Sequence, residues 1–539
     1  MICLLPMVAA ALAALGSDLA TWRDVLASVL PRYTRTTLAL VAVVSAATIV
    51  IGSLTAWLVT VYRFPGRAIL EIFLALPLAF PSFVLAYAYT DLLDFPGPVQ
   101  TLLRDLTGWT VRDYWFPEVR SFGGAAAMLS FVLYPYVYLL ARASFRQQSA
   151  AAYMVARTLG QTPTGAFLRV ALPMARPAIA GGALLVVMET IADFGTVAFF
   201  NVQTFSTGIY QAWFSLGDRG AAAQLSLVLL LFALLVAGLE RAQRGRARMA
   251  AQGQRFGDMD KVELHGLKAW GATALCTLPV LTGFVIPLIM LGVMADRSRQ
   301  SLFSSRYLEL IQNSLSVAAI AAVLTVLGAM MIALRSRIQT DRLSRGVTLI
   351  AGLGYAVPGA VIAVGLLVPF AALDNLIDRF MEARFGIDTG LLITGSIWLL
   401  VLAYMTRFMA AALNAFESGL MTVPPSFDAV GRSLGRSWGE VVRAVHLPMT
   451  RTSIVTALII VYVDVMKELP ATLILHPFDF QTLAVQAHRL AADERLAEAA
   501  LPSLVLVGFG LIPVALLCRT IGQEGARASK TFARALRTQ

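Results

Sequence analysis

The sequence predicts an all-α polytopic membrane protein with about twelve transmembrane helices, arranged as two pseudo-symmetric modules of six. Three observations support this prediction. Of the 539 residues, 58% are hydrophobic and 14% are charged, whereas a soluble globular chain carries about 25% charged residues. Long apolar runs follow one another on both sides of a polar central stretch. Two basic segments that lie 275 residues apart (430 minus 155) share the same spacing of residues.

Apolar runs of about 20 residues cross the hydrocarbon core as helices, because lipid offers the backbone no hydrogen-bond partners. The predicted spans are 2–16, 37–61, 69–92, 122–142, 175–200 and 222–240, followed by 269–293, 311–334, 346–372, 390–414, 453–475 and 498–518. The first run is short and lacks a basic segment before it. It is interpreted as a span, with a clipped span or a signal-like segment as alternatives.

Basic residues alternate from one loop to the next. Arginines follow the second, fourth and sixth spans, as in Arg142 and Arg146, whereas the alternate loops are acidic or mixed, as in Asp94 and Asp378. The positive-inside rule therefore predicts that the basic loops and the C-terminus lie in the cytoplasm. The net charge of +11 is explained by this topology, so no nucleic-acid partner is expected.

The two related segments read "VARTLGQTPTGAFLRVALP" from Val155 and "VGRSLGRSWGEVVRAVHLP" from Val430. Ten residues match in an ungapped window of 25 positions, 155–179 against 430–454. The chain is therefore predicted to be two fused copies of one module. The predicted divisions are a first module at 1–240, a cytoplasmic linker at 241–268, a second module at 269–518 and a cytoplasmic tail at 519–539.

Each segment predicts two short helices joined by a tight turn. Gly160 can take the left-handed conformation that closes a helix C-terminus, and Thr162, or Ser437 in the second copy, is a suitable N-cap for the next helix. Pro173 is expected to mark the turn into the following span. Such an element on the cytoplasmic face is shaped to dock into another protein. A loop that serves only topology would explain the charge but not the repeated spacing.

Both segments share one spacing: a glycine, nine residues, an aliphatic residue, one residue and then Leu-Pro. This spacing resembles the EAA coupling loop of type I ABC importer permeases. The loops lie at about 150–173 and 425–448. The acid that names the motif is replaced by Met154 and Ala429, with Asp428 one place earlier. The resemblance implies contacts with an ATPase through Arg157, Leu159, Gly160, Leu172 and Pro173, and through Arg432, Leu434, Gly435, Leu447 and Pro448.

No Walker A signature occurs, because none of the four lysines, Lys261, Lys268, Lys467 and Lys530, follows a glycine. ATP and Mg²⁺ are therefore expected on two separate ABC ATPase subunits. This chain is expected to be a transport permease, not an enzyme, and to bind no cofactor itself.

Ionisable residues inside a span are costly and usually face a pathway or a partner. Counted from the Leu-Pro prolines, Glu189 and Asp464 both lie at plus 16, and Asp193 and Glu468 both lie at plus 20. On a continuous helix each pair would share one face, and the four carboxylates would suit a hard cation. Lys467 is expected to pair with Asp464 or Glu468. The alternative is an interhelical network with a purely structural role. No metal ligands are assigned.

Several stretches resemble the fused ferric-iron importer permeases: "LALPLAFPSFVLAYAYTDLLDFPGPVQT" (74–101), "LSFVLYPYVYLLARASF" (129–145), "DVMKELPATLIL" (464–475) and "FDFQTLAVQAH" (478–488). The resemblance implies binding-protein-dependent iron transport across a bacterial inner membrane, with a periplasmic substrate-binding protein outside, a dimeric ATPase inside and alternating access between them. The fused thiamine permeases have the same architecture and are an alternative. An ion-coupled secondary transporter, in which the four acids relay protons, is an alternative of another class.

Overall fold

The structure, a computed structural model, describes residues 3–16, 22–23, 25–110, 112–147, 156, 158–251, 261–298, 300–301, 303–339 and 341–537. Within these ranges, ten helices are long and apolar enough to cross a membrane, and a pair bent by 95°, Arg67–Ala79 with Ser82–Thr107, supplies an eleventh candidate. The short apolar helix α1 (Leu5–Leu15) completes the set. The predicted all-α polytopic fold is confirmed, and each predicted span overlaps one helix or helix pair.

Helix α1 differs from the other predicted spans in length. Its 11 residues extend about 16 Å at 1.5 Å per residue, whereas the hydrocarbon core is about 30 Å thick. The described part of the first span therefore does not cross a bilayer by itself.

The chain forms two compact units, and each draws on both halves of the sequence. Unit 1 comprises Met1–Pro31, Gly208–Leu234 and Ser301–Gln486, and unit 2 comprises Arg32–Thr207, Leu235–Gln300 and Ala487–Gln539. These spatial units do not coincide with the predicted modules 1–240 and 269–518. The modules describe duplicated sequence and stay a prediction.

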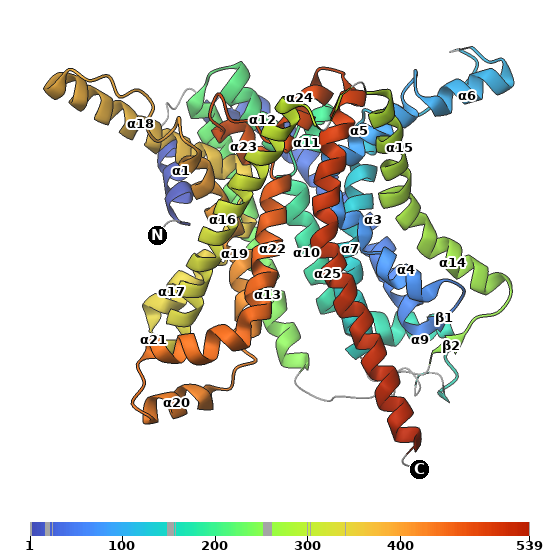
Figure 1. Ribbon diagram of the computed structural model, residues 1–539. Coiled ribbons are helices and arrows are strands. Elements are labelled where there is room, and N and C mark those ends of the chain that lie inside the picture. The colour runs from blue at the N-terminus through green and yellow to red at the C-terminus, as the bar shows by residue number, and fades with distance from the viewer. Residues whose placement is uncertain are drawn as a thin grey trace. The chain divides into compact units, whose positions relative to one another are not determined.

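Unit 1 is built around α16, α19 and α22, which pack against one another, while α1 packs against α18. In Figure 1, α20 and α21 lie at one end of these long helices and α23 lies at the other. The elements are α1, η1 (Val25–Val29), η4 (Gln211–Ser215), α16 (Ser305–Ile338), α17 (Arg342–Ala351), η6 (Gly354–Ala356), α18 (Gly359–Phe385), α19 (Ile397–Leu420), α20 (Pro425–Ser433), α21 (Trp438–Val441), η7 (Val442–His446), α22 (Leu447–Lys467) and α23 (Pro470–Leu475).

In unit 2, α7 packs against α10, and α15 packs against α25. The elements are α3 (Leu30–Val61), β1 (Tyr62–Arg63), α4 (Arg67–Phe73), η2 (Leu76–Ala79), α5 (Ser82–Leu93), α6 (Pro98–Thr107), α7 (Phe122–Gln147), α9 (Pro163–Ala166), η3 (Phe167–Ala171), α10 (Leu172–Ala192), α11 (Gly195–Phe199), β2 (Val262–Glu263), α14 (Leu267–Val280), η5 (Leu281–Val285), α15 (Ile286–Arg297) and α25 (Leu496–Arg537). Helices α12 (Phe205–Tyr210), α13 (Arg219–Ala251) and α24 (Leu483–Ala492) cross the division between the units, and α3 begins two residues before it.

Two predicted polar segments contain more regular structure than the sequence suggested. Helix α13 continues to Ala251, inside the predicted linker, and β2 pairs in parallel with β1 through Tyr62 and Val262. Helix α25 runs on through the predicted tail to Arg537. Alanine and arginine are strong helix formers, so a helix continues after its apolar part ends.

Close packing of α1 on α18 depends on Gly365. A Cβ at this position would lie 2.0 Å from the carbonyl oxygen of Pro6. Alanine normally stabilises a helix interior relative to glycine by about 1 kcal/mol. Here the clash reverses that preference.

We therefore expect Gly365→Ala to lower the free energy of unfolding by about 1–3 kcal/mol, the usual cost of overpacking a filled interior. The measurement is thermal unfolding of the purified chain in detergent. Gly346→Ala in α17 is the control, because a Cβ there meets nothing within 4 Å. Equal or higher stability of Gly365→Ala would contradict the packing argument.

Candidate functional site

The two related segments form the same backbone turn. Gly160 has a φ of 81° and Gly435 a φ of 76°, a left-handed conformation that is costly for residues with a Cβ. The same hydrogen bond closes both turns: the N–H of Gln161 donates to the carbonyl of Ala156 at 3.0 Å, and the N–H of Arg436 donates to that of Gly431 at 3.1 Å. The predicted left-handed glycines are confirmed, 275 positions apart.

The predicted N-caps are also present. The Thr162 hydroxyl accepts the N–H of Gly165 at 3.0 Å, and the Ser437 hydroxyl accepts the N–H of Glu440 at 3.4 Å. In the second copy the Glu440 carboxylate also accepts the N–H of Ser437 at 2.7 Å, which completes a capping box. Each turn therefore leads directly into a new helix.

The expected turn at Pro173 is wrong. Helix α9, the short π-helix η3 and α10 follow one another without a gap, and so do α21, the short π-helix η7 and α22. Each π-helix ends just before the Leu-Pro pair. Proline is tolerated at the start of a helical segment, where its missing N–H costs little. The second continuous helix, Trp438–Lys467, has 30 residues and extends about 45 Å.

Each turn presents an exposed leucine, since Leu159 is 76% and Leu434 is 73% exposed. In the second copy the Arg432 guanidinium lies over the Trp438 ring, 5.4 Å from its centroid. Arg157, its counterpart, lies outside the described residues. The remaining residues assigned to the coupling loops, Leu172, Pro173, Leu447 and Pro448, lie in the first turn of α10 or α22.

The second turn is anchored to unit 1 by ionic contacts. Asp428 of α20 is 9% exposed. Its carboxylate accepts the Nε–H of Arg337 at 2.7 Å and lies 2.6 Å from Nε2 of the fully buried His446. Arg337 also donates to the carbonyls of Leu420 and Val423. Asp428, which lies one place before the motif position, is therefore directed into its own unit.

In unit 2, aromatic rings pack around η3, the segment that corresponds to η7. Trp57 lies 4.7 Å from Phe167 and 5.4 Å from Phe145, measured between ring centroids. Subtracting 275 from Arg337 and His446 gives Tyr62 and Ala171, which cannot form the ionic contacts. Among the described residues, the contacts of Arg337 and His446 in the second copy therefore have no equivalent at these two positions of the first copy.

The expectation that the acids stack on one helix is wrong, because each helix ends between them. Helix α10 ends at Ala192 and α22 ends at Lys467, so Asp193 and Glu468 have extended backbone conformations. Glu189 and Asp464 stay within the helices, and both are half-buried.

Asp193 and Glu468 each cap the short helix that follows. The Asp193 carboxylate accepts the N–H groups of Thr196 and Val197 at 3.2 and 3.1 Å, and the Ser82 hydroxyl donates to it at 2.6 Å. The Glu468 carboxylate accepts the N–H groups of Ala471 and Thr472 at 2.8 and 2.9 Å.

The cation that pairs with Glu468 among the described contacts is Arg407 of α19, at 3.2 Å. The sequence favoured Lys467 and did not single out Arg407, which lies 61 residues away. Glu468 is 4% exposed. A Cβ on Gly359 would lie 2.2 Å from Nη1 of Arg407 and 2.6 Å from Oε1 of Glu468, so a larger residue there would displace this pair.

The sequence also did not predict a polar pair in unit 2. The Tyr87 hydroxyl lies 3.0 Å from Nδ1 of His488, and the His488 ring lies 5.6 Å from that of Phe194. No local spacing could have revealed a contact across 401 residues. Among the described residues, no three His, Cys, Asp or Glu side chains are grouped so that they could hold a metal ion.

Residues 48–249 match the sequence model of a family described as "Binding-protein-dependent transport system inner membrane component". The chain is similar to the Fe(3+)-transport system permease protein FbpB 2 of Haemophilus influenzae, with 26% identity over 89% of this chain and 88% of that protein. It is 30% identical to the molybdenum transport system permease protein ModB of Escherichia coli over 36% of this chain and 87% of that protein. The sulfate transport system permease protein CysT of Salmonella typhimurium is 29% identical over 28% of this chain and 51% of that protein.

Removing the buried acid of the second turn should loosen α20 and α21. Breaking one partner out of a buried ion pair typically costs about 3–5 kcal/mol. We expect Asp428→Ala to raise the rate of tryptic cleavage at Arg432 and Arg436 by about tenfold or more. Glu440→Gln is the matched control, because Glu440 is exposed. Equal cleavage rates in the two variants would show that Asp428 does not hold the turn.

Proposed function

Because this chain belongs to the family of binding-protein-dependent transport system inner membrane components, we propose that it is the membrane-spanning permease of an ATP-driven importer of ferric iron. The proposed orientation places the turns at Gly160 and Gly435 in the cytoplasm. A periplasmic binding protein delivers the iron, and two ABC ATPase subunits supply the energy.

The doubled turn is the observation that carries the proposal. Two glycines in the left-handed conformation, 275 positions apart, are closed by the same hydrogen bond. Beside each stands an exposed leucine, Leu159 or Leu434. An exposed apolar side chain on a rigid turn is the kind of anchor that fills a pocket on a partner. Two equal anchors fit two equal ATPase subunits.

The continuous helices provide a route from the ATPases to the pathway. In the second copy, one helix runs from Trp438, just after the turn, to Lys467, where the acidic break begins. In the first copy, α9, η3 and α10 connect Pro163 to Ala192 in the same way. ATPase closure would displace each turn, and the attached helix would carry the displacement to the break.

Ferric iron is proposed as the cargo because the similarity to the Fe(3+)-transport permease of Haemophilus influenzae covers both halves of the chain. The similarities to the molybdenum and sulfate permeases each cover little more than one third of it or less. Thiamine or another small solute is the alternative within the same class. An ion-coupled secondary transporter is the alternative of another class, and the family membership argues against it.

We assign different roles to the four acids. Glu189 and Asp464 are proposed to face the cargo, since they lie on the helix before each break and are half-buried. Asp193 and Glu468 are proposed to hold the breaks, since their oxygens accept the N–H groups of the next helix. Lys467 is proposed to reduce repulsion near Asp464 when no cargo is present.

The coupling role predicts that bulky residues at the turns block assembly with the ATPases. A side chain in the left-handed conformation costs about 1–2 kcal/mol, so Gly160→Val combined with Gly435→Val should weaken ATPase co-purification at least tenfold. The chain should still insert into the membrane. Gly439→Ala is the control, because Gly439 lies inside α21 with open space around its Cα.

Two results would overturn the coupling role. One is normal ATP-dependent uptake in the double valine variant. The other is uptake in energised vesicles that contain this chain without any ATPase, which would favour the secondary transporter.

The cargo role predicts that Glu189→Gln combined with Asp464→Asn abolishes uptake of radioactive iron into proteoliposomes and leaves the assembled complex intact. Loss of two carboxylates removes the preferred ligands of a hard cation. Asp193→Asn should instead lower thermal stability. If iron uptake survives the first pair of changes, the carboxylates are structural. If thiamine uptake is lost in place of iron uptake, the cargo assignment is wrong.

A further inference from the structure

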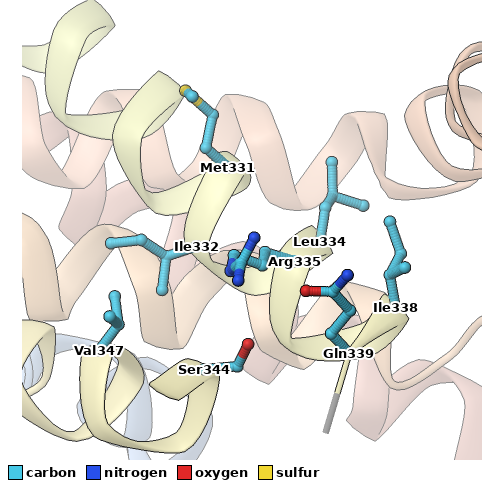
Figure 2. Close-up of a pocket in the computed structure, with 8 residues that line it drawn as sticks. All are labelled: Met331, Ile332, Leu334, Arg335, Ile338, Gln339, Ser344 and Val347. Carbon is cyan, nitrogen blue, oxygen red and sulfur yellow. The ribbon is translucent and has the colours of Figure 1, made fainter. Parts of the chain in front are cut away.

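A groove of about 540 Å³ lies in unit 1 between the last turns of α16 and the start of α17. Five apolar side chains form most of its surface, and three polar residues lie among them, as Figure 2 shows. The lining residues are Met331, Ile332, Leu334, Ile338 and Val347, together with Arg335, Gln339 and Ser344.

One polar group in the groove, the Ser344 hydroxyl, has no hydrogen-bond partner among the described residues. Ser344 is 3% exposed. Its backbone N–H donates to the Asp341 carboxylate at 2.9 Å, which fixes the residue at the start of α17. A buried hydroxyl without a hydrogen bond is unfavourable, because it has lost its contacts with water. The Ser344 hydroxyl therefore lacks a hydrogen-bond acceptor, which a ligand in the groove would supply.

A cation stands in the same groove. Figure 2 shows Arg335 in the middle of the lining residues, with the Ser344 hydroxyl directed toward the wall that carries Arg335 and Gln339. Arg335 is exposed, so its guanidinium is accessible to a ligand. A guanidinium and a hydroxyl together are typical donors for a phosphate group.

The surrounding charge favours an anion. Arg335 lies in the last turn of α16, and the exposed Arg342 and Arg345 follow in α17. Arg337 does not add to this charge, because it is paired with Asp428. Asp341 is the acid at this corner, and its carboxylate caps α17. Basic pockets between membrane-spanning helices are a known type of headgroup site for acidic lipids.

The apolar lining indicates the rest of the ligand. Met331 is 73% exposed, and the α16 helix that carries it is a candidate membrane span. A free anion would leave the apolar side chains of the groove in contact with water. An acyl chain would cover them, and each CH₂ group that it buries adds a favourable contribution.

We infer that the groove between α16 and α17 binds one acidic phospholipid, with the phosphate at Arg335 and Ser344 and an acyl chain along Met331, Leu334 and Val347. Figure 1 shows α17 at the same end of unit 1 as α20 and α21. The cytoplasmic leaflet follows from the proposed orientation of the turns, whereas the binding itself does not depend on it.

The site lies next to the anchor of the second turn. Arg337, two residues after Arg335 on α16, holds Asp428 of α20 and the carbonyls of Leu420 and Val423. A lipid that fixes the end of α16 against α17 therefore also fixes the support of α20. Bound acidic lipid should slow tryptic cleavage after the turn at Gly435.

The test is a lipid titration of the whole purified chain in detergent, followed by native mass spectrometry. The probes are dioleoyl phosphatidylglycerol, dioleoyl phosphatidylcholine with the same acyl chains, and inorganic phosphate. Phosphatidylglycerol should bind about tenfold more tightly than phosphatidylcholine, because only its headgroup carries a net negative charge. Arg335→Gln and Val347→Trp should each weaken phosphatidylglycerol binding about tenfold. Arg345→Gln, which changes a neighbouring exposed arginine outside the groove, should leave binding within about twofold.

Ser344→Ala separates ligand binding from folding. It removes a buried hydroxyl that has no partner, so the lipid-free chain should unfold at a higher temperature. The same change should weaken phosphatidylglycerol binding. Equal binding of the two lipids would overturn the headgroup assignment, and displacement of phosphatidylglycerol by equimolar phosphate would overturn the acyl-chain assignment. An Arg345→Gln effect as large as that of Arg335→Gln would show diffuse attraction to the basic surface and no site.

Discussion

Lipid offers no hydrogen bonds to an exposed backbone, and this constraint decides where the chain can depart from a helix. The two long helices after the turns end at Ala192 and Lys467. In both copies the next residue is an acid, Asp193 or Glu468, and its carboxylate accepts two N–H groups of the following short helix. The acid stabilises the break, so the breaks and the acids occur together.

The two copies keep the backbone geometry and differ in the side chains that hold it. In unit 1 the Glu468 cap is paired with Arg407, whereas in unit 2 the Asp193 cap accepts a hydroxyl from Ser82. The turn at Gly435 is held by Asp428 and Arg337, whereas Trp57 and its aromatic neighbours pack beside the other copy. Within one chain the two copies can diverge, because each needs to fit only its own surroundings.

The α16 helix connects the proposed lipid site with the second turn. Arg335 lines the groove, and Arg337 binds Asp428 and two carbonyls at the start of the coupling segment. Residues two apart on a helix point in different directions. One helix end therefore supports α20 on one face and offers a cation to the bilayer on another.

The sequence by itself determined the membrane class, the spans after the first, the left-handed glycines at 160 and 435 and their N-caps, since apolar length and local backbone preferences depend on neighbouring residues. Tertiary structure decided what depends on distant partners. The ion pairs Arg337–Asp428 and Arg407–Glu468 join residues 91 and 61 positions apart. The hydrophobic periodicity also did not predict the helix break that separates Glu189 from Asp193, because an apolar run looks the same whether it forms one helix or two. At the breaks before Asp193 and Glu468 the carboxylate also binds a distant side chain, Ser82 or Arg407, and a local sequence pattern does not predict that contact.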